Sequence, residues 1–221
     1  MTKPRGMKVV EEAIYRQKFV PVLRHSNEPV SLDLLQALAA EGVNCIEIAL
    51  TSPRALTSLR WARDRLPDGI ILGAGSALNA EMARLAIRAG AEFVASPGLN
   101  EAMIDVCRRA DVLAIPGIMT PTETMRAWHA GAHLVKMFPA SVLGPEFLSA
   151  IHGPLPWLRM MPTGGITDKN AAVFIRAGAV AVGLGSWLIN EEEALAKRWQ
   201  PLRERLKSLR DALRDATRHA T

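Results

Sequence analysis

A single lysine interrupts an apolar run near the middle of the chain. In LVKMFP, residues 134–139, Lys136 stands among apolar side chains of a strand-like segment that Pro139 closes. A charged amine is strongly disfavoured inside a sheet unless another group pairs or uses it. An amine removed from water also loses its proton more readily, and a neutral amine can attack a ketone to form a Schiff base. Lys136 is therefore a candidate nucleophile.

A carboxylate is predicted to share the space around this lysine. Glu47 lies in NCIEIAL, residues 44–50, and side chains alternate between the two faces of a strand. Ile46 and Ile48 suit a face covered by helices, so Glu47 belongs to the opposite, inward face, as Lys136 does by the same alternation. An inward carboxylate can move protons for the amine without a metal or other cofactor. The alternatives are a buried ion pair that only fills the core and a lysine on an exposed edge of the sheet.

Two glycine-rich turns follow the last two strand-like runs of the chain. PTGGITD contains Gly164 and Gly165, and GLGS contains Gly185 and Ser186. Backbone amides at a helix N-terminus, approached closely because glycine has no Cβ, bind anions. Either turn alone is more often a plain tight turn. Together, at adjacent strand ends, they predict a phosphate site.

Short strand-like runs and helical segments alternate eight times and must position these residues. The expected strands are residues 19–24, 44–50, 70–76, 92–98, 112–117, 133–139, 158–165 and 179–186. This alternation predicts an α/β fold, a single (β/α)8 TIM barrel with an extra N-terminal helix and a helical C-terminal tail. We expect one domain over residues 1–221, with the barrel over about 19–190. An open doubly wound sheet would carry a glycine-rich turn after its first strand, and HSNEPVS has no glycine.

Local signals mark the ends of the helices. Ser31 and Asn79 precede helical segments and are expected to cap them. RAGAEFVASPG, HAGAHLVKMFP and RAGAVAVGLGS repeat one pattern, in which Gly90, Gly131 and Gly178 come directly before an apolar strand. Each glycine is expected to take the left-handed conformation that ends a helix.

The length, composition and charge of the chain limit the classes of protein to which it can belong. The chain has 221 residues, of which 49% are hydrophobic, enough for one large core. Cys45 and Cys107 lack C-x-x-C spacing, which fits a reducing compartment and predicts a cytoplasmic location. No apolar run suits a signal peptide or a membrane span. A spread net charge of +5 with 5% aromatic residues argues against nucleic acid as a partner. The histidines lack metal-ligand spacing and are expected at the surface or at helix ends.

Six motifs, in order, carry a resemblance to a known family. They are GAGS (73–76), SPG (96–98), IPGIMTPTE (115–123), VKMFPAS (135–141), PTGGI (162–166) and GSW (185–187). Over about residues 15 to 190 the chain resembles the 2-keto-3-deoxy-6-phosphogluconate aldolases, a family that includes the phosphogalactonate and 4-hydroxy-2-oxoglutarate aldolases. The resemblance implies a class I aldolase, commonly a homotrimer, that cleaves a phosphorylated keto acid to pyruvate and glyceraldehyde 3-phosphate.

The resemblance also implies roles for single residues. Lys136 matches the Schiff-base lysine of the family and Glu47 its proton-transferring glutamate. The other matched positions bind substrate, namely Ser76, Pro97, Thr163, Gly164, Gly165 and Ser186. Ser76 stands where a threonine usually binds the pyruvate carboxylate, and this change keeps the hydroxyl group.

One position departs from the phosphogluconate pattern. Thr51 stands where many of those members have an arginine for the pyruvate carboxylate. The phosphogalactonate branch has a neutral residue there and an arginine at the end of strand one, the place of Arg24. We expect Arg24 to supply the contact, and a surface arginine is the alternative. Thr163 argues against the galactonate branch, which more often has an apolar residue there, so the C4 configuration of the substrate stays open.

Two other function classes remain. A phosphate-binding barrel isomerase or synthase would use Gly164, Gly165 and Gly185 equally well, with Lys136 only pairing with the charge of its substrate. A noncatalytic barrel that binds sugar acids would use the same pocket. Only the aldolase predicts a covalent adduct with pyruvate.

Overall fold

The computed structural model describes residues 5–26 and 29–218. The strands are β1 (Phe19–Leu23), β2 (Cys45–Ala49), β3 (Ile71–Gly75), β4 (Phe93–Ala95), β5 (Leu113–Ile115), β6 (Gly117–Ile118), β7 (Leu134–Met137), β8 (Arg159–Pro162) and β9 (Val182–Leu184). The helices are α1 (Met7–Gln17), α2 (Leu32–Ala40), α3 (Ala55–Arg65), α4 (Ala80–Arg88), α5 (Glu101–Arg109), α6 (Pro121–His129), α7 (Ala140–His152), α8 (Asp168–Arg176), α9 (Glu191–Leu195) and α10 (Gln200–Arg218).

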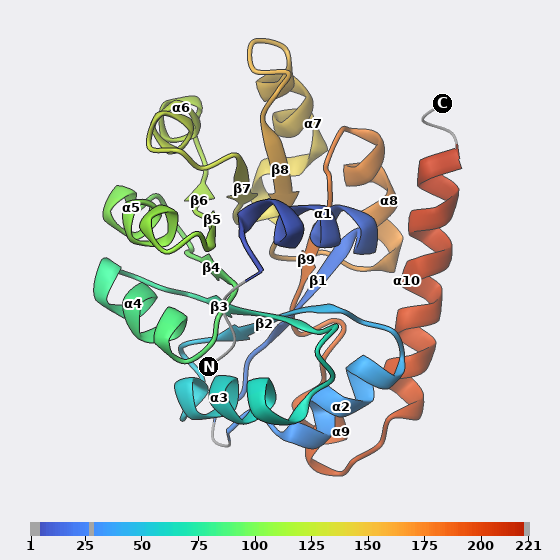
Figure 1. Ribbon diagram of the computed structural model, residues 1–221. Helices are drawn as coiled ribbons and strands as arrows, with labels where there is room; N and C mark the ends of the chain where they lie inside the picture. Colours follow the sequence, from blue (N-terminus) through green and yellow to red (C-terminus); the bar gives the residue numbers. More distant parts are fainter. Residues whose placement is uncertain (1–4, 27–28, 219–221) are drawn as a thin grey trace.

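All strand pairs within the two sheets are parallel. Six strands form a curled sheet in the order β5-β4-β3-β2-β1-β9, and three form a second sheet in the order β6-β7-β8. Helices surround the strands on the outside (Figure 1). The predicted parallel α/β fold is therefore confirmed, with an N-terminal helix and a helical C-terminal tail.

Two boundaries differ from the prediction. The strand expected over residues 112–117 is divided into β5 and β6 at Pro116, whose ring nitrogen has no N–H to continue the ladder. For the segment GPEFLSAIHG, residues 144–153, the sequence predicts a helix that begins at Gly144, but α7 begins at Ala140 and is interrupted at Gly144, where φ is 71°. Pro145 follows this break. Because glycine and proline both disfavour the interior of a helix, the sequence gives no sign that a helical turn precedes them.

The predicted helix ends are confirmed. The Ser31 hydroxyl accepts the Leu34 N–H at 3.1 Å, and the Asn79 side chain accepts the Met82 N–H at 2.9 Å. The three glycines of the repeated pattern have left-handed φ values, 101° at Gly90, 99° at Gly131 and 107° at Gly178. Each of them lies between a helix and the next strand, as the repeat requires.

Two apolar clusters lie on the two faces of the sheets. The outer cluster, between strands and helices, includes Ile46, Ile48 and Val135. The inner cluster, enclosed by the curled sheets, is formed by side chains from both sheets and from α1, including Val10, Ile14, Val20, Cys45, Phe93, Leu134 and Met161. The predicted alternation is confirmed, and α1 covers the amino ends of the strands (Figure 1). The opposite ends are left for a site.

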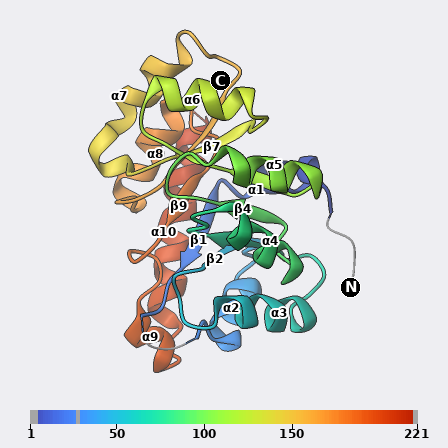
Figure 2. The ribbon, with the colours of Figure 1, turned by 90° about the vertical axis from the view of Figure 1, so that its left-hand side faces the viewer.

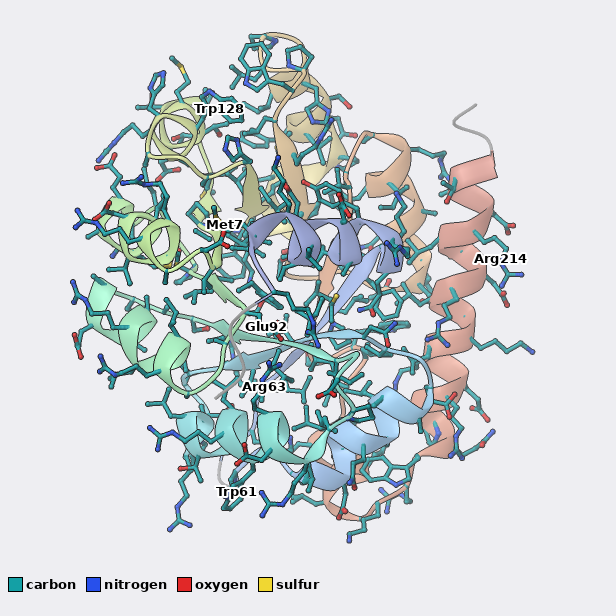
Figure 3. The ribbon with its side chains drawn as sticks, viewed as in Figure 1. Met7, Trp61, Arg63, Glu92, Trp128 and Arg214 are labelled. Atoms are coloured by element: carbon teal, nitrogen blue, oxygen red, sulfur yellow. The ribbon has the colours of Figure 1, made fainter. Side chains whose placement is uncertain are left out.

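A buried carboxylate fixes the segment that enters α1. Glu92 lies just before β4 and is paired with Arg5 at 2.9 Å and with Arg63 of α3 at 3.0 Å. Figure 3 shows Arg63 and Glu92 below α1. Two guanidinium groups compensate a carboxylate that would otherwise be costly to bury.

The C-terminal tail is part of the packed structure. Helix α10 runs along α8 (Figure 1) and buries its apolar side chains Leu202, Leu206, Leu209 and Leu213. Helix α9 lies near its lower end (Figure 2). Within the described ranges, no helix combines the length and apolarity that a membrane crossing requires.

Candidate active site

Lys136 and Glu47 meet in the space between the two sheets. Lys136 lies on β7 and Glu47 on β2, and both side chains are buried. The Lys136 Nζ lies 3.1 Å from Oε1 of Glu47 and 3.4 Å from Oε2. The predicted convergence of these two residues is confirmed. A carboxylate at this distance can accept the proton that an ammonium must lose before its nitrogen can attack a carbonyl carbon.

Two glycines leave the space that the side chains of Glu47 and Thr163 occupy. A Cβ at Gly75 on β3 would lie 1.8 Å from Oε1 of Glu47, and a Cβ at Gly183 on β9 would lie 2.3 Å from Oγ1 of Thr163. The sequence reading missed the role of both. The available signal was a pair of glycines two residues apart in GAGS and again in GLGS, since glycine inside a strand often marks a close approach.

A cavity of about 800 Å³ opens above Lys136 at the carboxyl ends of the strands. Seven of the ten predicted site residues line it, namely Arg24, Lys136, Thr163, Gly164, Gly165, Gly185 and Ser186. Ser26 and Glu191 also line the cavity, and the sequence reading missed both. Seven of the predicted residues thus border one space that a small molecule can enter, whereas Glu47, Ser76 and Pro97 do not line it.

The glycine turns border this cavity. Gly164 and Gly165 have left-handed φ values of 94° and 76°, and α8 begins three residues later. Their carbonyl groups are used inside the protein: the Gly164 oxygen accepts the Ser141 N–H at 3.0 Å, and the Gly165 oxygen accepts the Asn170 side-chain amide at 2.9 Å. The Gly185 oxygen accepts the Leu188 N–H at 3.0 Å. Turns held in this way can direct N–H groups toward an anion.

Arg24 and Ser76 are neighbours at the mouth. Arg24 follows β1 and is exposed, and its Nη2 donates to Oγ of Ser76 at 3.3 Å. Thr51 is also exposed. Pro97 follows β4 and is not among the residues that line the cavity. Its carbonyl oxygen would lie 2.2 Å from a Cβ on Gly117, so this segment packs closely on β6.

The prediction for His25 was wrong. Its side chain is buried and not at the surface, whereas its neighbours Arg24 and Ser26 are exposed. The His25 N–H donates to Oγ of Ser52 at 3.1 Å, and Nδ1 lies 3.7 Å from a carboxylate oxygen of Glu191. His219 lies outside the described residues.

Comparison with known proteins identifies the family. The model of the KDPG and KHG aldolase family matches residues 10–204. The chain belongs to the KDPG and KHG aldolase family. This confirms the resemblance seen in the motifs and places the chain among the lyases.

Relatives of this aldolase-family chain fall in more than one branch. It is 35% identical over 191 residues to a 2-dehydro-3-deoxy-phosphogluconate aldolase of Treponema pallidum (strain Nichols), covering 86% of this chain and 90% of the relative. It is 36% identical over 171 residues to a probable 2-dehydro-3-deoxy-6-phosphogalactonate aldolase of Rhizobium meliloti (strain 1021), covering 76% and 80%.

A solved structure of the family has the same fold. It is KDPG aldolase from Legionella pneumophila with pyruvate captured at low pH as a covalent carbinolamine intermediate. The two structures match with a TM-score of 0.82 at 28% identity, over 90% of this chain and 97% of that one.

Proposed function

We propose that this protein is a class I aldolase that cleaves a 2-keto-3-deoxy-6-phospho sugar acid to pyruvate and glyceraldehyde 3-phosphate. The observation that carries the proposal is the buried Lys136 amine, 3.1 Å from the Glu47 carboxylate, at a cavity bordered by two glycine turns. The pyruvate carbinolamine of the Legionella relative supports the same chemistry here.

The proposed reaction begins when Glu47 takes a proton from Lys136. The neutral Nζ attacks the keto carbon C2, and the carbinolamine loses water to give an iminium. A proton leaves the C4 hydroxyl, the C3–C4 bond breaks, and the electron pair moves toward the iminium to give an enamine. The aldehyde departs, C3 takes a proton, and water releases pyruvate and the free amine. Glu47, directly or through a water, carries these protons.

The cavity offers one group for each end of the substrate. Arg24, whose guanidinium suits the geometry of a carboxylate, would bind the pyruvate carboxylate together with the Ser76 hydroxyl, which lies 3.3 Å from its Nη2. The phosphate would lie against the amides of the turns formed by Gly164, Gly165, Gly185 and Ser186, and Pro97 helps to shape the mouth. Thr163, which lines the cavity together with Lys136 and the glycine turns, would contact the hydroxyl groups of the substrate.

The configuration of the substrate at C4 is a matter for experiment. The two relatives named above belong to the gluconate and galactonate branches at nearly equal identity. Purified protein is incubated with each 2-keto-3-deoxy-6-phospho epimer, and pyruvate is measured with lactate dehydrogenase and NADH. We expect pyruvate from at least one epimer and a large loss of rate in Glu47→Gln. A folded protein that releases none from either would leave the isomerase, synthase or binding functions.

We also infer that the two sheets form one closed (β/α)8 barrel within a single domain over residues 1–221. At one junction, β5 continues into β6 across Pro116, whose oxygen accepts the Lys136 N–H at 2.8 Å. At the other, the Val180 N–H donates to the Met160 oxygen at 3.1 Å, and Thr163 bridges to Gly183. An experimental structure with either junction open would contradict this.

We propose a homotrimer in the cytoplasm. Three large apolar side chains are exposed, Met119 directly after β6, Met125 on α6 and Val142 in the first turn of α7, where a neighbouring copy could cover them. Light scattering should give three times the mass of one chain, and a monomer mass would refute the trimer. Cys45 and Cys107 are free and buried, which suits a reducing compartment and is testable by cell fractionation.

A further inference from the structure

One carboxylate from the C-terminal tail holds the loop that follows β1. Glu191 accepts two hydrogen bonds from Ser26, at 3.0 Å from the backbone N–H to Oε1 and at 2.9 Å from the hydroxyl to Oε2. Nδ1 of His25 lies 3.7 Å from Oε1. Hydrogen bonds to an ionised acceptor are stronger than those between neutral groups. Both carboxylate oxygens thus accept hydrogen bonds from Ser26, and one of them lies beside the His25 ring.

The same loop is held from a second side. The His25 N–H donates to Oγ of Ser52 at 3.1 Å, and the Ser52 N–H donates to the Ala49 oxygen at 2.9 Å, at the end of β2. Arg24 comes directly before these anchored residues. Its exposed side chain would lose considerable rotational freedom on binding a ligand. Because the backbone beside it is already fixed, binding would not also have to order the backbone, and the entropic cost of binding is smaller.

The position of Glu191 is fixed by contacts within the C-terminal tail. It is the first residue of α9, whose cap Asn190 accepts the Glu193 N–H at 3.0 Å. Glu193 is paired with Arg205 of α10, and Nε of Arg205 donates to the Leu188 oxygen at 3.0 Å. Because α10 packs along α8, the tail connects Glu191 to the main body of the fold.

We infer that Glu191 is a positioning residue for substrate binding: through its two hydrogen bonds from Ser26 it holds the backbone near Arg24, so that the guanidinium lies beside Ser76 at the mouth. The C-terminal tail is then part of the substrate site. This inference rests on the proposed function, in which Arg24 binds the pyruvate carboxylate. Because Glu191 also lines the cavity, a direct contact with substrate is the competing explanation.

The test measures the pyruvate concentration that gives half-maximal trapping of a borohydride-reduced adduct on Lys136. Loss of one charge-assisted contact by Arg24→Ala should raise this concentration by about 10- to 100-fold. Glu191→Ala should raise it by about tenfold, with trapping at saturating pyruvate within about twofold of the unchanged protein. Glu191→Gln, which keeps one acceptor oxygen and the side-chain shape, should have a smaller effect. Glu192→Ala, a matched change at an exposed neighbour, should have none.

The double variant Arg24→Ala/Glu191→Ala separates the explanations. If Glu191 acts through Arg24, the double variant requires no more pyruvate than Arg24→Ala alone. Effects that multiply would indicate a direct contact, and a Glu191→Ala value equal to that of Glu192→Ala would show no positioning role. A loss at saturating pyruvate in Glu191→Gln would indicate general damage. Any of these last three results would overturn the inference, provided that the unchanged protein still forms the adduct. If the unchanged protein forms no adduct, the proposed function is overturned as well.

Discussion

Replacing Gly75 with alanine should displace the carboxylate that serves the lysine. The added Cβ would lie 1.8 Å from Oε1 of Glu47 and 2.5 Å from its carboxyl carbon. Contacts of a Cβ below 3.0 Å are essentially never found, so Oε1 must move by at least about 1.2 Å. The present distance from Oε1 to Nζ of Lys136 is 3.1 Å, so such a shift can take the carboxylate out of hydrogen-bonding range.

The expected cost follows from the role of the pair. A displacement of about 1 Å can lower a rate about 100-fold, which equals about 2.7 kcal/mol of activation free energy. Gly75→Ala should therefore lower kcat about 100-fold in the pyruvate-release assay. In a Glu47→Gln background, the same substitution should lower kcat by less than about threefold, because the proton-transferring group is already absent.

Gly73→Ala is the matched control on the same strand. Its Cβ would lie 2.1 Å from the ring of Phe93, which belongs to the inner apolar cluster and not to the site. Both substitutions should lower the unfolding temperature, since overpacking typically costs about 1–3 kcal/mol. Only Gly75→Ala should lose activity strongly at a temperature where both variants are folded. A normal kcat in Gly75→Ala, or an equal loss in Gly73→Ala, would refute the reasoning.

Further predictions concern binding, pH and thiol reactivity. Arg24→Ala should raise KM about 10- to 100-fold with kcat changed less, and an unchanged KM in steady-state kinetics would contradict its role. A hydrogen bond from Arg205 lowers the pKa of Glu193 below its usual 4.5, so the pair stabilises the fold above that pH and the contribution is lost as pH falls through the lowered value. The melting-temperature advantage over Glu193→Gln should therefore shrink on acidification, and a constant difference would refute this. Burial raises the thiol pKa of Cys45 and of Cys107 to about 12, so a thiol reagent at pH 8 should label both only after denaturation; rapid labelling of native protein would count against it.

The parts of the site that follow from strand alternation could be predicted from sequence. The inward direction of Glu47 and Lys136 follows because isoleucine, valine and methionine neighbours occupy the helix-covered face. The glycine turns were recognisable because they directly follow strands. The division at Pro116 was harder to foresee, since the surrounding residues form an apolar run and the proline interrupts only the hydrogen-bond ladder.

Contacts between segments that are distant in the sequence could not be predicted from strand alternation. Ser26 and Glu191 are separated by 165 positions, and neither stands in a motif that suggests a partner. The burial of His25 depends on how the loop after β1 packs against Ser52 and α9, which no local pattern encodes. Gly75 belongs to the GAGS motif, but the reason for a glycine there is the Glu47 carboxylate, which approaches from a different strand.

The most direct test of the central claim is borohydride reduction of the protein in the presence of pyruvate, followed by intact and peptide mass spectrometry. Lys136→Ala is treated in parallel, and its circular dichroism spectrum verifies that it is folded. We predict a reduced pyruvyl adduct on Lys136 that is absent from the variant. A folded protein without an adduct at saturating pyruvate, or an adduct that persists in Lys136→Ala, would contradict the Schiff-base mechanism.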